Sequence, residues 1–112
     1  MKIYYKKRAI DIDVRKVSFF EEFYGLMFRT SRAKNLLFDF FNYNRISLHS
    51  LFVFFPFLAV WLDEKNNVLD FKIVRPFTLS VKPRMQFKKF IEIPLNLRNK
   101  KFIEFFRREG KI

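Results

Sequence analysis

The side chains that could do chemistry are few in this sequence. His49 is its only histidine, and histidine is the side chain that titrates closest to neutral pH. Arg29 and Asp63 are charged residues that could belong to the same site, and Gly25 could admit a ligand or a closely packed strand. We therefore predict four candidate pocket or binding residues: Gly25, Arg29, His49 and Asp63. A lone histidine beside a strand is more often a hydrogen-bonded structural residue, so a structural role for His49 stays open.

Catalytic and metal-binding patterns have little support. The chain has no cysteine, which excludes disulfides, thiolate chemistry and cysteine-based zinc sites. Asp11 and Asp13 lie on one face of a predicted strand, as a metal-binding or acid–base pair could, but this spacing is also typical of the solvated face of an antiparallel strand. We predict no catalytic residue, no metal and no cofactor, and we leave enzymatic activity uncertain, with the balance against it.

The positive charge lies mainly at the two ends of the chain. The net charge is +12; residues 1–16 carry six Lys or Arg against two acids, and residues 72–112 carry twelve against three. If the two ends meet, their shared face would attract an anionic partner such as RNA or DNA. The alternative is that the charge only keeps a phenylalanine-rich chain soluble. The candidate basic surface comprises Lys6, Lys7, Arg8, Lys88, Lys89, Lys100, Lys101, Arg107 and Arg108.

The stretch 49–74 is expected to organise the elements that position these residues. It contains the longest apolar run, residues 51–62, which is interrupted by Pro56. A membrane-spanning helix needs about twenty apolar residues, so this run is predicted to be a core hairpin and not an anchor. The N-terminus lacks the apolar run of a signal peptide. We expect a single domain over residues 1–112, in the cytoplasm.

The hydrophobic spacing predicts many strands and few helices. Period-two alternation predicts that Glu92 points outward and that Asp70 lies on the opposite face of its strand from Leu69 and Phe71. A capping box, Ser18 with Glu21, begins the clearest helix. A turn is predicted over residues 41–45. Asn99 is expected to cap a short C-terminal helix in which Phe102, Ile103 and Phe106 form one apolar stripe. The strands are predicted at residues 2–5, 9–14, 36–40, 46–55, 57–62, 68–74, 77–81 and 87–95. The predicted fold class is α+β and β-rich, with a twisted antiparallel sheet or partly closed small barrel, one packed helix and a short C-terminal helix.

Several segments together resemble a known family. They are residues 24–29 (YGLMFR), 36–40 (LLFDF), 49–71 (HSLFVFFPFLAVWLDEKNNVLDF) and 90–94 (FIEIP). In this order they resemble the family called "domain of unknown function 192", over about residues 10–95. The form of the segment that begins at His49 is similar to that of archaeal members. The resemblance implies a small β-rich domain, and it implies no reaction.

The chain departs from the family pattern at three places. Leu58 stands where the family usually has Asp, and Leu95-Asn96-Leu97 stands where a Gly usually follows the last strand. The closing Gly-Val-x-Val-Gly-Asp motif survives only as Glu109-Gly110-Lys111. If the missing Asp belongs to a site, this chain has lost that site; otherwise the Asp has a structural role.

Three functions are compatible with these observations. The first is a binding or accessory domain without catalysis, with a groove beside Gly25, Arg29 and His49. The second is a nucleic-acid-binding module that uses a basic surface from residues 1–16 and 72–112. The third is an enzyme of unknown reaction whose site includes Arg29, His49 and Asp63. The sequence identifies no ligand and no oligomeric state.

Overall fold

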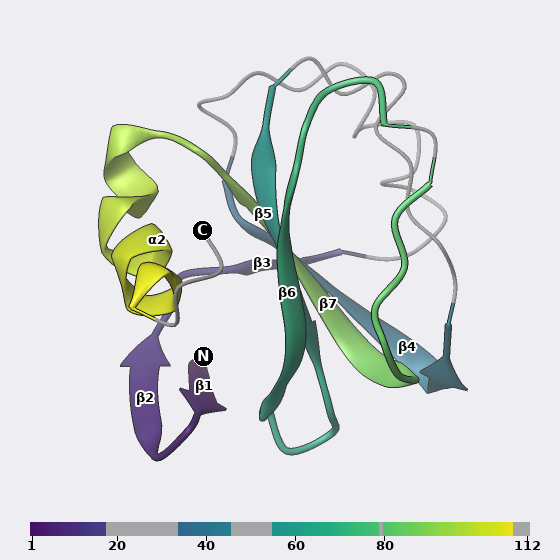
Figure 1. Cartoon of the computed structure of the whole chain (residues 1–112). Helices are drawn as coiled ribbons and strands as arrows, with labels where there is room; N and C mark the ends of the chain where they lie inside the picture. Colours follow the sequence, from purple (N-terminus) through teal and green to yellow (C-terminus); the bar gives the residue numbers. More distant parts are fainter. Residues whose placement is uncertain (18–33, 46–54, 79, 109–112) are drawn as a thin grey trace.

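A computed structural model describes residues 1–17, 34–45, 55–78 and 80–108 (Figure 1). Within them a five-stranded sheet has the strand order β3-β4-β7-β5-β6, and a separate two-stranded sheet is formed by β1 and β2. The elements are β1 (Lys2–Tyr5), β2 (Arg8–Asp11), β3 (Arg15–Val17), β4 (Leu36–Asn44), β5 (Phe57–Leu62), β6 (Val68–Val74), β7 (Phe87–Pro94), the 3-10 helix η2 (Leu97–Asn99) and α2 (Lys100–Arg107). The predicted β-rich α+β class is confirmed, with open sheets instead of a closed barrel.

The hairpin of β5 and β6 lies where the sequence predicted it. The two strands pair antiparallel from Phe57↔Val74 to Leu62↔Val68, and β5 also pairs with β7. All six residues of β5 are buried. Strand β5 is therefore a central strand covered on both faces, which explains why neither face of this strand carries a polar residue.

The two faces of the five-stranded sheet contribute to two hydrophobic clusters. On one face, Leu58 and Ile91 pack with Ile3 of the N-terminal hairpin and with Phe106 of α2. The other cluster comprises Leu36, Phe38, Phe55, Phe57, Ala59, Trp61, Val74, Phe87 and Phe90. Complete burial of one large apolar side chain stabilises the fold by about 1.5–3 kcal/mol. Most phenylalanines in the described part of the chain are thus core residues.

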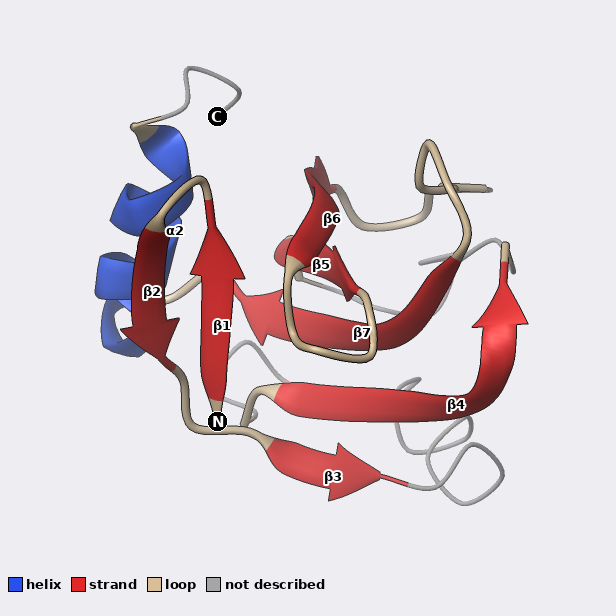
Figure 2. Ribbon diagram, turned by 90° about the horizontal axis from the view of Figure 1, so that it is seen from below, coloured by secondary structure: helices blue, strands red, loops and turns tan. Residues whose placement is uncertain are grey.

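The two ends of the chain meet at one side of the molecule. Figures 1 and 2 both show the β1–β2 hairpin beside α2. The Arg8 guanidinium donates a hydrogen bond to the Phe105 carbonyl oxygen at 3.0 Å and lies 4.4 Å from the centre of the Phe105 ring. Lys6 and Lys7 form the turn with φ of 47° and 65°, so a primed turn forms without the Gly or Asn that usually favours it.

Strand β4 differs from its prediction because it continues to Asn44. The two asparagines suggested a turn over residues 41–45, but the chain remains extended and passes through an irregular register between Asp39↔Lys89 and Asn44↔Phe87. The short strand β3 pairs with the first half of β4 in parallel. The sheet is therefore mixed at this edge and antiparallel elsewhere.

The segment between β6 and β7 also differs from its prediction. Residues 77–81 alternate in hydrophobicity, yet their described residues form no strand: Phe77 has φ of 64°, and Val81 takes part in a single bridge. Two contacts fix the segment to β6. Lys72 Nζ donates to the Lys82 carbonyl oxygen at 2.7 Å, and the Arg84 amide donates to Asp70 Oδ2 at 3.1 Å.

The C-terminal helix follows the prediction with one change. In α2 the buried side chains are Phe102, Phe105 and Phe106, where Ile103 was predicted to stand in place of Phe105. Neither helical segment in the described part of the chain has the length and hydrophobicity that crossing a bilayer requires. The predicted helix over residues 18–28, residues 46–54 of the predicted strand 46–55, and Gly110 lie outside the described residues.

Candidate functional site

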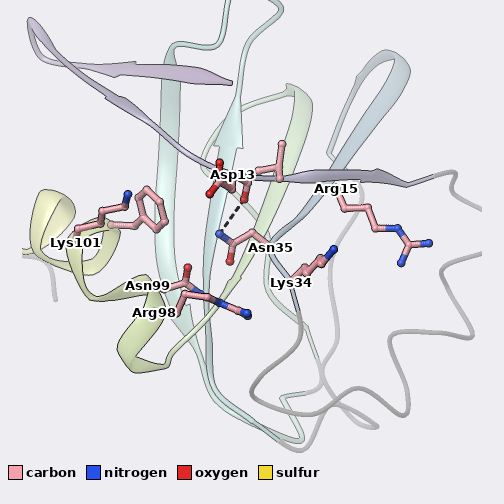
Figure 3. Close-up of a pocket in the computed structure, with 9 residues that line it drawn as sticks. Asp13, Arg15, Lys34, Asn35, Arg98, Asn99 and Lys101 are labelled. Carbon is pink, nitrogen blue, oxygen red and sulfur yellow. Dashed lines mark hydrogen bonds between the residues drawn. The ribbon is translucent and has the colours of Figure 1, made fainter.

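A pocket of about 560 Å³ lies where the two ends of the chain approach the start of β4. Its walls come from the segment after β2, from the residues before β4, from η2 and from the first turn of α2 (Figure 3). The described residues that line it are Asp13, Val14, Arg15, Lys34, Asn35, Arg98, Asn99, Lys101 and Phe102. Four of these nine side chains are cationic and one is a carboxylate, so the pocket is strongly positive.

Asn35 occupies the middle of the pocket. Its side chain is 6% exposed, and its Nδ2 donates a hydrogen bond to the Asp13 carbonyl oxygen at 3.0 Å. The backbone carbonyl oxygen of Asn35 accepts a hydrogen bond from the backbone amide of Arg15 at 2.9 Å. These bonds join the chain before β3 to the chain before β4. The Asn35 Oδ1 atom is buried and has no hydrogen-bond partner.

Asn99 fixes the wall formed by η2 and α2. It is 1% exposed, and its Nδ2 donates to the Pro94 carbonyl oxygen at 2.7 Å. Its backbone amide donates to Asn96 Oδ1 at 3.0 Å, which caps η2. Asn99, the predicted capping residue of the last helix, therefore anchors that helix to the end of β7. Asn96 provides the side-chain cap of η2. Arg98 and Lys101 are held beside the pocket as a result.

The cations of the pocket come from distant parts of the sequence. Arg15 belongs to the N-terminal segment 1–17 and Lys34 to the segment 34–45, whereas Arg98 and Lys101 belong to the C-terminal segment. Guanidinium and ammonium groups form the strongest protein contacts to carboxylates and phosphates. The helix dipole favours negative charge at the N-terminus of α2, and the first turn of α2 contains no acidic residue that would supply it. The arrangement can hold an anion.

None of the four predicted pocket residues is among the described residues that line this site. Gly25, Arg29 and His49 lie outside the described residues. Asp63 lies in the β5–β6 loop, where its Oδ1 accepts from the amides of Lys65 at 2.9 Å and Asn67 at 2.8 Å. Its Oδ2 accepts from the Asn67 side chain at 3.0 Å. These bonds give Asp63 a structural role in the turn, and its role in binding stays a prediction.

The nine residues of the predicted basic surface are divided between two ends of the molecule. Lys88 contacts Asp39 at 2.8 Å, and Lys89 contacts Asn66 at 2.8 Å. Figures 1 and 2 both show this end of β7 far from α2. The other seven lie on the β1–β2 hairpin and at α2: Lys6, Lys7, Arg8, Lys100, Lys101, Arg107 and Arg108. Of the nine, Lys101 alone lines the pocket.

Two acidic residues of the sheet are buried, although alternation predicts an outward position for one of them, Glu92. Asp70 is 5% exposed and Glu92 is 2% exposed. Asp70 accepts from the amides of Phe71 at 2.9 Å and Arg84 at 3.1 Å, and Arg84 Nε lies 3.6 Å from it. Glu92 lies between Leu36 and Ala59 on the neighbouring strands. Alternation alone failed here because the sheet is covered on both faces, so polar positions of a strand can also face a packed layer.

The paired aspartates show no metal-binding arrangement. Asp11 and Asp13 are both exposed on either side of the buried Ile12, as expected for the solvated face of the chain. Asp13 reaches the pocket, where its backbone oxygen accepts from Asn35. In the described part of the chain, no group of three or more His, Cys, Asp or Glu residues could hold a metal ion.

A family model matches most of the chain. The family model DUF192, described as an uncharacterized ACR, matches residues 2–104. The chain belongs to this family. The match extends beyond residues 10–95, the range that the resemblance suggested, and it includes the pocket residues Asn35, Arg98 and Lys101.

Two solved structures have the same fold as this DUF192 member. A protein from Sinorhizobium meliloti 1021, called a "putative transcription regulator", has a TM-score of 0.72 at 16% identity, over 90% of this chain and 81% of its own. A protein of unknown function from Novosphingobium aromaticivorans DSM 12444 has a TM-score of 0.70 at 13% identity, over 91% and 76%. At these identities the likeness concerns the fold alone. No curated protein matches the chain.

The structure also shows the surroundings of the substituted family position. Leu58 is completely buried and is paired with Ile73 on one side and Ile93 on the other. In this DUF192 member the position belongs to the core beneath the N-terminal hairpin and α2. It does not line the cationic pocket.

Proposed function

We propose that this DUF192 member is a small binding domain without catalysis, and that it holds an anionic ligand in the pocket around Asn35. The observation that carries the proposal is that Arg15, Lys34, Arg98 and Lys101 all line one pocket. Among the described residues that line it, the only opposing charge is that of Asp13. Such a concentration of like charge becomes favourable when an anion is bound between the cations.

The magnitude of the interaction supports binding of a small anion. Two unit charges 4 Å apart interact by about 4 kcal/mol at an effective dielectric constant of about 20. A volume of about 560 Å³ is within the range of small-ligand sites, roughly 300–1,000 Å³. The described lining contains no histidine, serine or cysteine, so it supports binding better than nucleophilic chemistry.

The test is calorimetric titration of the chain with inorganic phosphate and inorganic pyrophosphate. The pocket variant carries Arg98→Gln and Lys101→Gln. The control variant carries Lys88→Gln and Lys89→Gln, which remove the same charge from the other end of the molecule. A hydrogen bond to a charged group contributes about 1.5–3 kcal/mol, so the pocket variant should bind at least tenfold more weakly than wild type.

The control variant should retain the wild-type affinity apart from a small uniform change that salt removes. Equal losses in the two variants would mean that only the net charge attracts the anion. Absence of saturable binding to wild type at low salt would contradict the proposal.

A second candidate is a nucleic-acid-binding module. It is favoured by the charge of +12 and by Phe41, which is 98% exposed on β4 and could stack on a base. The name of the Sinorhizobium protein points the same way. Anisotropy of a labelled single-stranded RNA should then show affinity that falls steeply with salt and drops in Phe41→Ser. Binding that Phe41→Ser leaves unchanged would count against this candidate.

We further propose that the chain acts in the cytoplasm. The net charge of +12 and the absence of cysteine are compatible with this location. Localisation of a tagged chain in fractionated cells would test it, and recovery outside the cytoplasm would contradict it.

A further inference from the structure

The buried oxygen of Asn35 gives the pocket a second chemical requirement besides positive charge. The Asn35 Oδ1 atom has no hydrogen-bond partner although its residue is 94% buried. A buried acceptor without a donor is costly and is rare in native proteins. The four cations of the pocket do not donate to this atom, so a donor is required from elsewhere.

The orientation of the Asn35 amide is fixed by its other bond. Nδ2 donates to the Asp13 carbonyl oxygen at 3.0 Å. A reversed amide would place Oδ1 against that oxygen, and because both atoms are acceptors no hydrogen bond could form between them. Figure 3 shows the amide oxygen on the side of Asn35 that faces Asn99 and Arg98. The middle of the pocket therefore presents an acceptor, while the surrounding cations present donors and charge.

These two requirements restrict the class of ligand. Inorganic sulfate has charge and no donor, and a neutral polyol has donors and no charge. A phosphate ester with free hydroxyl groups has both, because the phosphate can contact Arg98, Lys101 or Lys34 while a hydroxyl donates to Asn35. We propose that the pocket recognises a phosphorylated polyol or sugar, with Asn35 Oδ1 as the acceptor for a ligand hydroxyl. This inference rests on the proposed anion-binding function.

The test uses two ligands that differ by their hydroxyl groups alone. Glycerol 3-phosphate and n-propyl phosphate have the same charge and the same carbon chain, and only the former can donate from that chain. In calorimetric titration, wild type should bind glycerol 3-phosphate about tenfold more tightly than n-propyl phosphate. In Asn35→Leu the two ligands should bind with equal affinity.

A second readout keeps the test independent of the stability of the variant. In the wild-type chain labelled with ¹⁵N, the side-chain amide signals of Asn35 should shift when glycerol 3-phosphate is added, and should shift less with n-propyl phosphate. Titration with ribose 5-phosphate then compares a sugar phosphate with the shorter polyol phosphate. Tighter binding of either one than of n-propyl phosphate supports the proposed class.

The possible failures are distinguishable. If both esters bind wild type equally, or if Asn35→Leu keeps the preference for glycerol 3-phosphate, the role of Asn35 is overturned while the anion-binding function stands. If neither ester nor inorganic phosphate binds, the proposed function fails, and the inference fails with it.

Discussion

The β5–β6 loop and the pocket around Asn35 show two different uses of polar side chains. In the loop, both oxygens of Asp63 accept hydrogen bonds from its own turn, and Lys89 donates to Asn66 and to the Glu64 carbonyl oxygen. In the pocket, Asn35 uses its nitrogen to join two segments and leaves its oxygen without a partner. A polar cluster that satisfies itself supports structure, whereas one that gathers several cations around an acceptor without a partner is suited to a ligand.

The largest effect that would test this comparison is expected at Asn99. Asn99→Ala removes the buried bond to the Pro94 carbonyl oxygen, and a buried acceptor left without its donor costs about 1–3 kcal/mol. Urea denaturation should therefore show a loss of about 2 kcal/mol in the free energy of unfolding. The affinity for phosphate should also fall several-fold, because η2 positions Arg98.

A smaller effect on stability, with none on binding, is expected at Asp63. Asp63→Ala removes three accepted hydrogen bonds, but water can replace them in this exposed loop. A loss of about 1–2 kcal/mol in the free energy of unfolding follows. Phosphate titration of this variant should give the wild-type affinity.

Asn99→Ala and Asp63→Ala thus form a matched pair. If both lower the phosphate affinity to the same extent, the loss at Asn99 reflects stability alone, and the distinction between the two regions breaks down. If only Asn99→Ala lowers it, the wall formed by η2 and α2 is part of the site.

The smallest effect is expected at Phe41. Its ring is 98% exposed, and exposed substitutions usually change stability by less than about 0.5 kcal/mol. Phe41→Ser should therefore leave both the unfolding curve and the phosphate affinity unchanged. If this variant lost RNA binding, the end of β4 would have a binding role separate from the pocket. This end of β4 contacts the β5–β6 loop through the Tyr43 hydroxyl.

Much of the sheet could be predicted from the sequence because its strands are locally distinct. The β5–β6 hairpin has an unbroken apolar run before the polar loop 63–67 and an alternating apolar segment after it, and this local pattern is typical of a hairpin. The turn predicted over residues 41–45 was wrong because β4 continues to Asn44, where the strand pairs with Phe87 of β7 after an irregular stretch. The outward orientation of Glu92 was wrong because its environment depends on what covers the sheet.

The pocket was harder to predict because its residues are far apart in the sequence. The concentration of charge at the two ends was visible, and it did point to the segments that supply Arg15, Arg98 and Lys101. Lys34 and Asn35 carry no motif of their own. Their contribution depends on the parallel pairing of β3 with β4, which the hydrophobic pattern does not specify.

The most direct test of the central claim is a nuclear magnetic resonance titration of the ¹⁵N-labelled chain with inorganic phosphate. The claim predicts saturable shifts of the amide signals of Arg15, Asn35 and residues 98–101, with little change in the β5–β6 loop at residues 63–67. Shifts centred on that loop, or small shifts spread over all exposed lysines without saturation, would contradict it.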